Sequence, residues 1–405
     1  MLKECLDRVY DVGGKVMKML FIHDNRFWKY GNEYYSYGHF AYELLWKRYL
    51  RYFDEIVVGG RIEDVKDYSE VKSLSISSGK NVSFFGLPNL MSFSGLKKCS
   101  EAKSIIAEQM EQADCVVIRL PSNLGYLACK IAEQMHKKYM IEVVGCTWDD
   151  LWNYGTLVGK CYAPISFLIE RKCVKKASNV LYVSRRFLQK RYPNHKFNMG
   201  CSDTNISVSD DDVLNRRIER IHDNMNHTIR LGLIASLNVG YKGHDTAIYA
   251  MQEILKKHKN VKLCFLGDGK KDKWEQLAKK CGVFDSVEFS GALPGGNPVL
   301  NWLDHIDIFI MPSLQETLGR ALIEAMSRGC PAIGGAGTAV PEQLGDDCIH
   351  ERKDYHELAD MVCYMIEHPK YMELCAIENF ERSKKYSEEI LSERRDYFWN
   401  RVLNV

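Results

Sequence analysis

The fold of this chain is decided by one stretch, which reads Met311-Pro312-Ser313-Leu314-Gln315-Glu316-Thr317-Leu318-Gly319-Arg320-Ala321-Leu322-Ile323-Glu324-Ala325-Met326-Ser327-Arg328-Gly329-Cys330-Pro331. An apolar segment, Ile306 to Met311, comes before it. After Pro312 a short polar turn leads into a helical pattern, which stops at Gly329 and Pro331. The stretch therefore predicts a strand, a loop that contains Glu316, and a helix that contains Glu324.

A strand–loop–helix element of this kind is suited to bind an anion. The first turn of the helix directs backbone N–H groups and a positive helix end toward one point. A carboxylate in the loop beside a diphosphate could hold sugar hydroxyls or stabilise a developing positive charge. The alternative is an ordinary turn with two surface glutamates, and two carboxylates alone do not decide between these interpretations.

Length and composition indicate a globular protein of two or three domains. Its 405 residues are 46% hydrophobic and 27% charged, which are values typical of soluble proteins. No apolar run reaches the roughly 18 residues of a membrane-spanning helix. Residues 1–16 contain acids and lack the apolar core of a signal peptide. We expect them to be a disordered extension, or a consequence of the choice of start site, and we expect a cytoplasmic location.

The cysteines do not form a recognisable site. There are 14 of them, and no two have the Cys-x-x-Cys spacing, which argues against a zinc site and a compact disulfide framework. We expect buried, reduced thiols, with one reactive cysteine as the alternative.

The basic residues are concentrated in one segment. Residues 1–200 hold 30 Lys and Arg against 21 Asp and Glu, a balance of +9, which leaves −7 for the remainder of a chain with net charge +2. Residues 160–196 contain ten bases and one acid, Glu170. The bases are Lys160, Arg171, Lys172, Lys175, Lys176, Arg185, Arg186, Lys190, Arg191 and Lys196. We expect contact with an anionic membrane. A solvated helix face is the alternative, and no nucleic-acid motif is present.

Short apolar strands alternate with helical patterns in both halves, which predicts parallel sheets. The predicted strands are Met19–His23, Glu55–Val58, Cys115–Arg119, Tyr139–Val144, Val180–Val183, Ile229–Ala235, Val261–Leu266, Val287–Phe289 and Ile306–Met311. The predicted helices are Glu101–Gln112, Leu124–Lys137, His244–His258, Lys273–Cys281, Gly319–Arg328 and Tyr355–Ile366.

The stretch with the weakest apolar periodicity marks a boundary between two domains. We expect one domain at 17–200, a linker at 201–227 and a second domain at 228–385. The linker contains Asp210, Asp211 and Asp212, which we interpret as solvated acids, with a metal site as the alternative. The last segment, 386–405, is expected to be a helix, which could pack on either domain.

The chain resembles the retaining GT-B glycosyltransferases, above all glycosyltransferase family 4, in several motifs. Glu316 and Glu324 match the family's Glu-x7-Glu motif. Further motifs resemble family elements and lie in Ala235–Leu237, Lys242–Gly243, Phe265–Gly269, Val287–Gly291 and Gly337–Glu342. The resemblance is strong from about Arg230 to Glu367 and looser before. It implies an α/β GT-B fold, in which two Rossmann-like domains face each other across a cleft and the C-terminal helix crosses back onto the N-terminal domain.

The resemblance also implies a phosphate-binding lysine, Lys242. In the family this lysine pairs with an arginine just after the preceding strand. Here that position is Ser236 or Leu237, so the chain departs from the pattern. Arg320, on the first turn of the helix, is our first candidate for the second positive charge, and Arg119, at a strand end, is the second.

The remaining site residues follow from the same resemblance. Glu316 would contact the donor sugar and act in catalysis, and Glu324 would bind the ribose. Three further groups would complete the donor site: Thr317 with the N–H groups of Leu318 and Gly319, Leu293 against the base, and Gly31, whose lack of a side chain lets the backbone approach the diphosphate. For Gly31 a simple turn is the alternative.

The acceptor side of the site departs from the family. Family members often have a histidine after the fourth or fifth strand, but this chain has Cys146-Thr147-Trp148-Asp149-Asp150 there. Asp149 is predicted to orient an acceptor hydroxyl or to accept its proton, with helix capping as the alternative. This run, together with 119–122 and 182–184, is similar to a branch found in bacterial surface-polysaccharide (capsule) clusters.

The resemblance implies a retaining, metal-independent transferase without a cofactor. Its partners would be a nucleotide diphosphate sugar, uridine-linked by expectation, and a glycan or lipid-linked acceptor. Three alternatives stay open. A glycan phosphorylase would need a pyridoxal-phosphate lysine, which we do not find. A nucleotide-sugar epimerase would release nucleotide and sugar without an acceptor. A non-catalytic sugar-binding subunit would bind nucleotide sugars without turnover.

Overall fold

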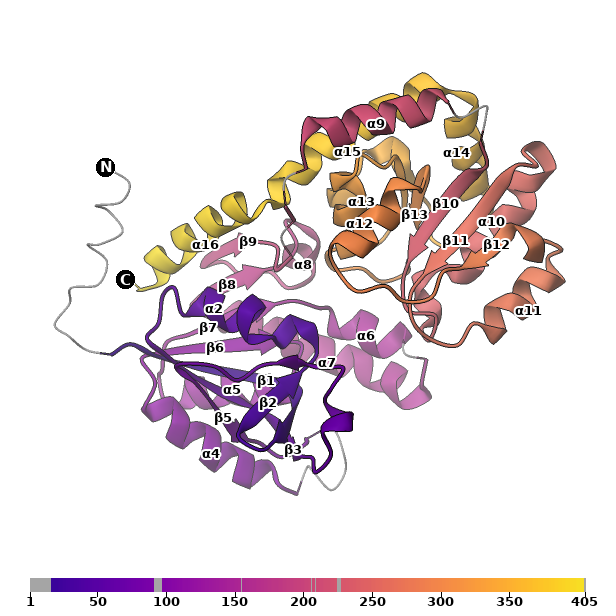
Figure 1. Ribbon diagram of the computed structural model, residues 1–405. Coiled ribbons are helices and arrows are strands. Elements are labelled where there is room, and N and C mark those ends of the chain that lie inside the picture. Colours follow the sequence, from indigo (N-terminus) through magenta and orange to yellow (C-terminus); the bar gives the residue numbers. More distant parts are fainter. Residues whose placement is uncertain are drawn as a thin grey trace, which may run out of the picture. The chain divides into compact units, whose positions relative to one another are not determined.

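The computed structural model describes residues 16–90, 97–153, 155–204, 206–207, 209–223 and 227–403. The predicted N-terminal extension, 1–16, lies outside these ranges except for its last residue. The chain divides into two compact units (Figure 1). The first comprises the residues up to Val144 with Leu168–Leu181 and Tyr192–Asn198, and the second comprises Gly145–Phe167, Tyr182–Arg191 and Met199–Val405.

The first sheet is mainly parallel and contains the predicted N-terminal strands. Its order is β4-β2-β1-β6-β7-β8-β9, with β3 paired to β1 and β5 paired to β3. The strands are β1 (Lys18–Tyr30), β2 (Glu33–Ser36), β3 (Glu55–Asp64), β4 (Ser75–Ile76), β5 (Val82–Gly86), β6 (Cys115–Leu120), β7 (Tyr139–Val143), β8 (Asn179–Tyr182) and β9 (Phe197–Gly200). The helices of this half are α2 (Lys47–Tyr49), α4 (Cys99–Glu111), α5 (Asn123–Gln134), α6 (Thr147–Asn153), α7 (Leu157–Lys176) and α8 (Phe187–Arg191).

Strand β1 is longer than predicted, which changes the setting of Gly31. The expected strand, Met19–His23, pairs with β3 and β6, but the chain stays extended to Tyr30. It does so because Trp28–Tyr30 also pair with the antiparallel strand β2. Gly31 therefore occupies the turn of a β-hairpin, with φ +59° and no atom within 4 Å of an added Cβ.

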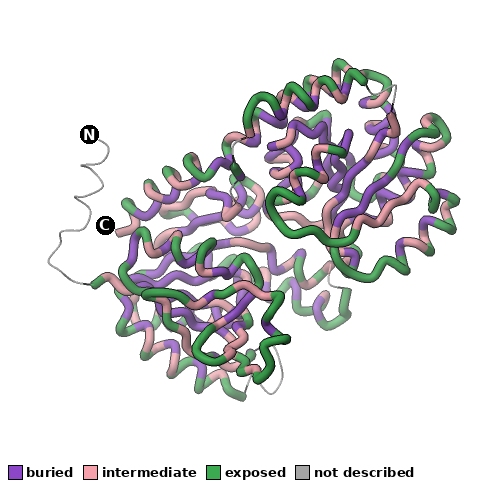
Figure 2. The backbone as a smooth tube through the Cα atoms, in the orientation of Figure 1, coloured by how far each residue is buried: buried purple, intermediate pink, exposed green. Residues whose placement is uncertain are grey.

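The second sheet contains the strand that leads into the stretch 311–331. Its order is β12-β11-β10-β13-β14-β15, and every pairing in it is parallel. The strands are β10 (Ile229–Ile234), β11 (Val261–Leu266), β12 (Val287–Phe289), β13 (Ile308–Met311), β14 (Ala332–Gly335) and β15 (Ile349–His350). The helices are α9 (Asp211–His222), α10 (His244–Lys257), α11 (Asp272–Lys280), α12 (Asn297–Asp304), α13 (Arg320–Ser327), α14 (Tyr355–Glu367), α15 (Pro369–Ser383) and α16 (Glu388–Leu403). Buried positions follow these strands and the inner faces of the helices (Figure 2), as expected for a parallel sheet with both faces covered.

The segment predicted as a linker, 201–227, contains helix α9. Val213, Arg217 and Ile221 form its buried face, at the i, i+4, i+8 spacing of a helix. The middle position is an arginine, which hid the apolar pattern in the sequence. Its guanidinium donates hydrogen bonds to the carbonyl oxygens of Leu303 and Ile306, so the buried charge is satisfied. The three aspartates start this helix, where negative charge is favourable.

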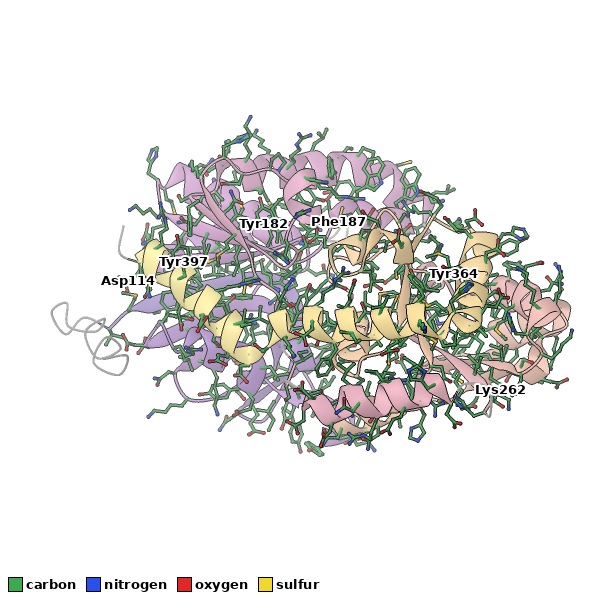
Figure 3. All side chains as sticks on the ribbon, turned by 90° about the horizontal axis from the view of Figure 1, so that it is seen from above. Asp114, Tyr182, Phe187, Lys262, Tyr364 and Tyr397 are labelled. Atoms are coloured by element: carbon green, nitrogen blue, oxygen red, sulfur yellow. The ribbon has the colours of Figure 1, made fainter. Side chains whose placement is uncertain are left out.

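The C-terminal segment is helical, as predicted. Helix α16 contacts the start of the segment after β9: the Cys201 thiol lies 3.7 Å from the carbonyl oxygen of Leu391, and Arg395 donates to the carbonyl oxygen of Ser202. Figure 3 shows the side chains along α14 and α16, where Tyr364 and Tyr397 remain about half exposed. Packing of α16 on the N-terminal domain stays a prediction.

Among the described residues, no helix is both long enough and apolar enough to cross a membrane.

Candidate functional site

Three loops meet at the carboxyl edge of the second sheet. They follow the adjacent strands β11, β10 and β13 and comprise residues 267–271, 235–243 and 312–319. Hydrogen bonds join neighbouring loops: the Lys270 N–H donates to Asn238 Oδ1 at 3.1 Å, and the Leu314 N–H donates to the Tyr241 carbonyl oxygen at 2.8 Å. The carboxyl edge of a parallel sheet is the usual position of ligand sites in α/β folds.

Gly243 allows the loops after β10 and β13 to touch. It adopts φ +79°, and a Cβ at this position would lie 2.3 Å from the Pro312 carbonyl oxygen. No other residue type fits such a contact without moving one of the backbones. Gly243 also caps the N-terminus of α10, so the same turn directs the start of this helix toward the site.

Lys242 and Glu316 form an ion pair at this junction. Lys242 Nζ lies 2.6 Å from Glu316 Oε1, and the two side chains expose 24% and 12% of their surface. An ammonium group has three donors, so this contact leaves Lys242 able to bind a second anion. The sequence predicted both residues in the site, and the structure brings them together.

The loop that carries Glu316 is held at several points. The Ala339 N–H donates to the Glu316 carbonyl oxygen at 2.8 Å, Arg352 Nη2 donates to that of Leu314 at 2.9 Å, and Gln343 Nε2 donates to that of Leu318. Gly319 then turns with φ +70° into helix α13. The segment 337–342, predicted to resemble the family's Gly-rich turn, thus supports the Glu316 loop through Ala339.

Glu324 and Arg320 lie one turn apart on α13. Burial raises the pKa of Glu324, and the charge of Arg320 opposes the shift. Arg320 is exposed. The charge of Arg320 thus acts on Glu324, while the prediction that it replaces the family's arginine remains untested.

Lys273 is a cation that sequence reasoning missed. Ser236, at the position of the absent arginine, places its hydroxyl 3.4 Å from the Asp268 carbonyl oxygen and carries no charge. Lys273, on α11, lies within 3.9 Å of where a Cβ of Gly240 would be. Gly240 begins the turn that ends at Lys242, so Lys273 brings a second ammonium group to the same loop.

The charges of both lysines affect the pKa of the His244 ring. It is fully buried at the start of α10 and stacks on Trp274 with ring centroids 4.8 Å apart. Burial lowers the pKa of His244 to about 4; a hydrogen bond to the Ala235 backbone opposes this shift, and the charges of Lys242 and Lys273 add to it. The imidazole is therefore neutral at pH 7 and adds no positive charge to that of the two lysines.

Asp149 and its neighbour Asp150 have different partners in the structure, and the acceptor role expected of Asp149 stays a prediction. Asp149 is buried and accepts a hydrogen bond from Arg191 Nη1 at 2.8 Å. Asp150 accepts one from the side chain of Gln315, the neighbour of Glu316, and Asn153 donates to the same glutamine at 3.1 Å. Helix α6 therefore contacts the Glu316 loop through Asp150 and Asn153.

The Asp150 carboxyl group ionises less readily than a free one. Burial, and then the charge of Asp149, raise its pKa to about 7, while the hydrogen bond from Gln315 opposes the shift. More than a third of the residue's surface is exposed, and this contact with solvent limits the shift. A carboxyl group whose pKa is raised toward neutral pH can exchange protons with an acceptor hydroxyl.

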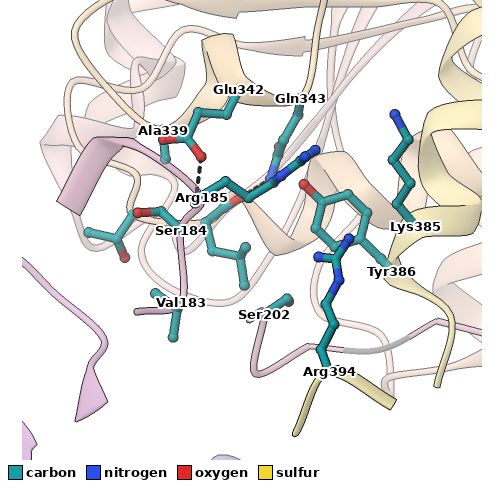
Figure 4. Close-up of a pocket in the computed structure, with 12 residues that line it drawn as sticks. Val183, Ser184, Arg185, Ser202, Ala339, Glu342, Gln343, Lys385, Tyr386 and Arg394 are labelled. Atoms are coloured by element: carbon teal, nitrogen blue, oxygen red, sulfur yellow. Dashed lines mark hydrogen bonds between the residues drawn. The ribbon is translucent and has the colours of Figure 1, made fainter. Parts of the chain in front are cut away.

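A small pocket lies beside the loop that carries Glu316 (Figure 4). It is lined by Thr317, Leu318 and three cations, Arg185, Lys385 and Arg394. Its wall includes Glu342, whose carboxylate accepts hydrogen bonds from the N–H groups of residues 185–187. Neither Lys242 nor Glu316 lines this pocket, so we assign no substrate to it.

Three other residues predicted for the site, Leu293, Gly31 and Arg119, lie outside the three loops. Leu293 is 39% exposed in the loop after β12, where contact with a base stays a prediction. Gly31 belongs to the first unit. Arg119, also in the first unit, is buried and forms an ion pair with Glu142, with 3.7 Å between Nη1 and Oε2. Its charge is thus compensated locally.

The sequence is similar to those of known proteins. The profile of a family described as "Glycosyl transferases group 1" matches residues 228–368. The chain is 32% identical to Protein CapJ of Staphylococcus aureus over 388 residues, which is 94% of each chain.

Solved structures show the same fold at lower identity. Anabaena Alr3699/HepE in complex with UDP superposes with a TM-score of 0.65 at 14% identity, covering 94% of this chain and 98% of the other. The lipopolysaccharide outer core galactosyltransferase WaaB has a TM-score of 0.64 at 14% identity and the same coverage.

Proposed function

Because the chain belongs to the group 1 glycosyltransferases and has the GT-B fold, we propose that it transfers a sugar from a nucleotide diphosphate sugar, with retention of configuration and without a metal. The observation that carries the proposal is the Lys242–Glu316 pair at 2.6 Å. It lies where two glycines, Gly243 and Gly319, turn into helices α10 and α13.

Each residue has a defined task in this proposal. The leaving group is a nucleoside diphosphate, so charge builds up on its oxygens as the glycosidic bond breaks. Lys242 and the N–H groups of Leu318 and Gly319 stabilise that charge, because preorganised donors are worth most where charge develops. Glu316 holds the donor sugar beside Lys242, and Glu324 accepts hydrogen bonds from the ribose hydroxyls.

We assign Lys273 the role of the absent arginine. Its position near Gly240 supports this assignment over Arg320. The charge of Arg320 acts on Glu324 instead.

Asp150 serves the acceptor in this proposal. Its link to Gln315 supports a position beside the sugar that is transferred. Asp149, which we predicted for this role, then acts indirectly, through its ion pair with Arg191.

We further propose a uridine-linked donor and an acceptor from bacterial surface-polysaccharide synthesis. The support is the UDP named in the HepE structure and the lipopolysaccharide activity named for WaaB. The protein would work in the cytoplasm, at the inner face of the cell membrane, through bases of 160–196. Some of these bases have internal partners: Lys176 forms an ion pair with Glu133 and Arg191 with Asp149.

A donor panel tests the proposal. Purified protein is mixed with UDP-, GDP-, ADP- and dTDP-sugars, with and without a lipid-linked glycan acceptor, and nucleotide release is measured. We expect release from one nucleotide class that depends on the acceptor, and an intact rate in chelator. Equal release without acceptor would indicate the epimerase. Thermal stabilisation by a nucleotide sugar without turnover would indicate a sugar-binding subunit, because ligand binding to the folded state alone raises its stability.

A further inference from the structure

Helix α7 presents an unusual outward face. From its start to Glu170, its buried positions are small or polar: Gly159, Ala163, Ser166 and Glu170. Its first three turns instead expose large apolar side chains to solvent: Leu157 is 81% exposed, Val158 80%, Tyr162 37%, Ile165 56% and Leu168 63%. This is the reverse of a helix that covers a core, where the apolar stripe faces inward. We call these five residues the apolar face of α7.

The same side of the helix becomes basic toward its C-terminus. Arg171, Lys172 and Lys175 are exposed and continue the outward positions of the apolar face. The acid of this helix, Glu170, is fully buried and lies 3.3 Å from the hydroxyl group of Tyr126. Every exposed charge on α7 is therefore positive, which selects an anionic partner.

An exposed aromatic residue lies beside the first turn of α7. Trp152, on α6, is 44% exposed and stacks on Trp148 with ring centroids 5.4 Å apart. Lys160 Nζ, on the first turn of α7, lies 5.8 Å from the centroid of the Trp152 ring. Tryptophan and lysine side by side are typical of surfaces that meet the boundary between lipid head groups and acyl chains.

We propose that the apolar face of α7 inserts into the head-group region of an anionic bilayer, with Arg171, Lys172 and Lys175 bound to lipid head groups. A helix that lies in the interface combines apolar side chains, which enter the acyl boundary, with bases that contact anionic lipids. This deepens the membrane contact of the proposed function, because attachment depends on burial of leucine, valine and isoleucine as well as on charge. It requires no sugar donor, so its test is independent of transferase activity.

Two variants separate the contributions. The apolar variant carries Leu157→Gln, Ile165→Gln and Leu168→Gln, and the charge variant carries Arg171→Gln, Lys172→Gln and Lys175→Gln. The matched control replaces two leucines of similar exposure, Leu44→Gln and Leu374→Gln, which are 63% and 60% exposed on other elements. All these positions are exposed, so the variants should fold, and thermal unfolding checks this.

The assay is flotation with vesicles of phosphatidylcholine, alone or mixed with phosphatidylglycerol, at low and high salt. We expect wild type to float with the mixed vesicles and to keep part of that binding at high salt, because apolar burial is not screened. The apolar variant should lose about tenfold of the salt-resistant binding or more, since each Leu or Ile removed forfeits burial. The charge variant should lose binding at low salt, and the control should match wild type.

A natural reporter provides a second readout. Cys161 lies on the outward side of α7 and is the one cysteine classed as exposed among the thirteen in the described residues. An environment-sensitive dye on Cys161 should brighten when mixed vesicles are added to wild type. Two results would overturn the proposal: an apolar variant that floats as well as wild type at both salt levels, or a wild-type dimer in solution that the apolar variant dissociates, because the face would then be covered by a second copy.

Discussion

Replacing Gly243 by alanine should separate the two loops that form the donor site. The added Cβ would lie 2.3 Å from the Pro312 carbonyl oxygen and 2.7 Å from its carbon, whereas ordinary contacts begin at 3.4 Å. The backbones must therefore move apart by about 1.1 Å, the difference between 3.4 and 2.3 Å. That movement breaks the 2.8 Å hydrogen bond between Leu314 and Tyr241 and displaces the neighbouring Lys242 from Glu316.

Gly282→Ala is the matched control for this change. Gly282 has φ +69° and no atom within 4 Å of an added Cβ, so alanine there costs only the left-handed conformation, about 1–2 kcal/mol. Gly243→Ala adds a backbone clash and a lost hydrogen bond, roughly 2 kcal/mol more. For domains of this size that difference lowers Tm by a further ~4–8 °C.

Scanning calorimetry and nucleotide release measure the two consequences. We expect Gly243→Ala to lower kcat/KM by about 10²-fold, the scale of an ångström misplacement near the chemistry, and Gly282→Ala to leave it unchanged. If both variants have the same Tm and the same kcat/KM, the close contact between the loops does not position Lys242, and the reasoning fails.

Other predictions follow from the same contacts. Asp150→Asn should lower kcat by about 10²-fold and remove the acid limb of the pH–rate profile, because the deprotonated carboxylate, with its pKa raised to about 7, is the active form and is lost as pH falls; an acid limb that persists in this variant would contradict the role. Lys273→Met should raise KM for the donor about tenfold or more. Arg320→Met should affect the donor mainly through the loss of its charge beside Glu324. If Arg320→Met raises KM for the donor more than Lys273→Met does, over the same range of donor concentrations, the prediction that Arg320 replaces the absent arginine would be restored. Chelator should leave the rate unchanged, and a rate that returns only with magnesium or manganese would exclude the metal-free site.

Strands of the second half were predictable for two reasons. Val261–Leu266 has the predicted bounds because it is buried except at Lys262, and such an apolar run between turn residues is characteristic of parallel strands. Val287–Phe289, a partly buried edge strand, also has the predicted bounds, and the family motif indicated it. Helix α9 was missed for the opposite reason. Its buried face is centred on Arg217, and a buried arginine becomes acceptable only through the carbonyl oxygens that distant residues supply.

The candidate site was predicted in part. Motifs with fixed spacing predicted Lys242, Glu316, Gly319 and Glu324; the structure brings Lys242 and Glu316 into contact, and the roles of all four residues stay predictions. Lys273 was not, because it reaches the phosphate loop from a separate helix, and no local pattern distinguishes it from other surface lysines. The sequence alone could not distinguish the surroundings of Asp149 from those of Asp150. Asp149 bonds to Arg191, 42 residues away in sequence, and Asp150 bonds to Gln315, 165 residues away.

The central claim is that Lys242, held by Glu316, stabilises the diphosphate of a nucleotide sugar. The most direct measurement compares kcat/KM for nucleotide release in wild type, Lys242→Met, Glu316→Gln and the control Lys262→Met, whose exposed side chain lies near the opposite end of β11 from the site. We expect losses of about 10²–10³-fold for the first two variants and none for the control. Unchanged turnover in Lys242→Met, with its fold intact, would contradict the claim.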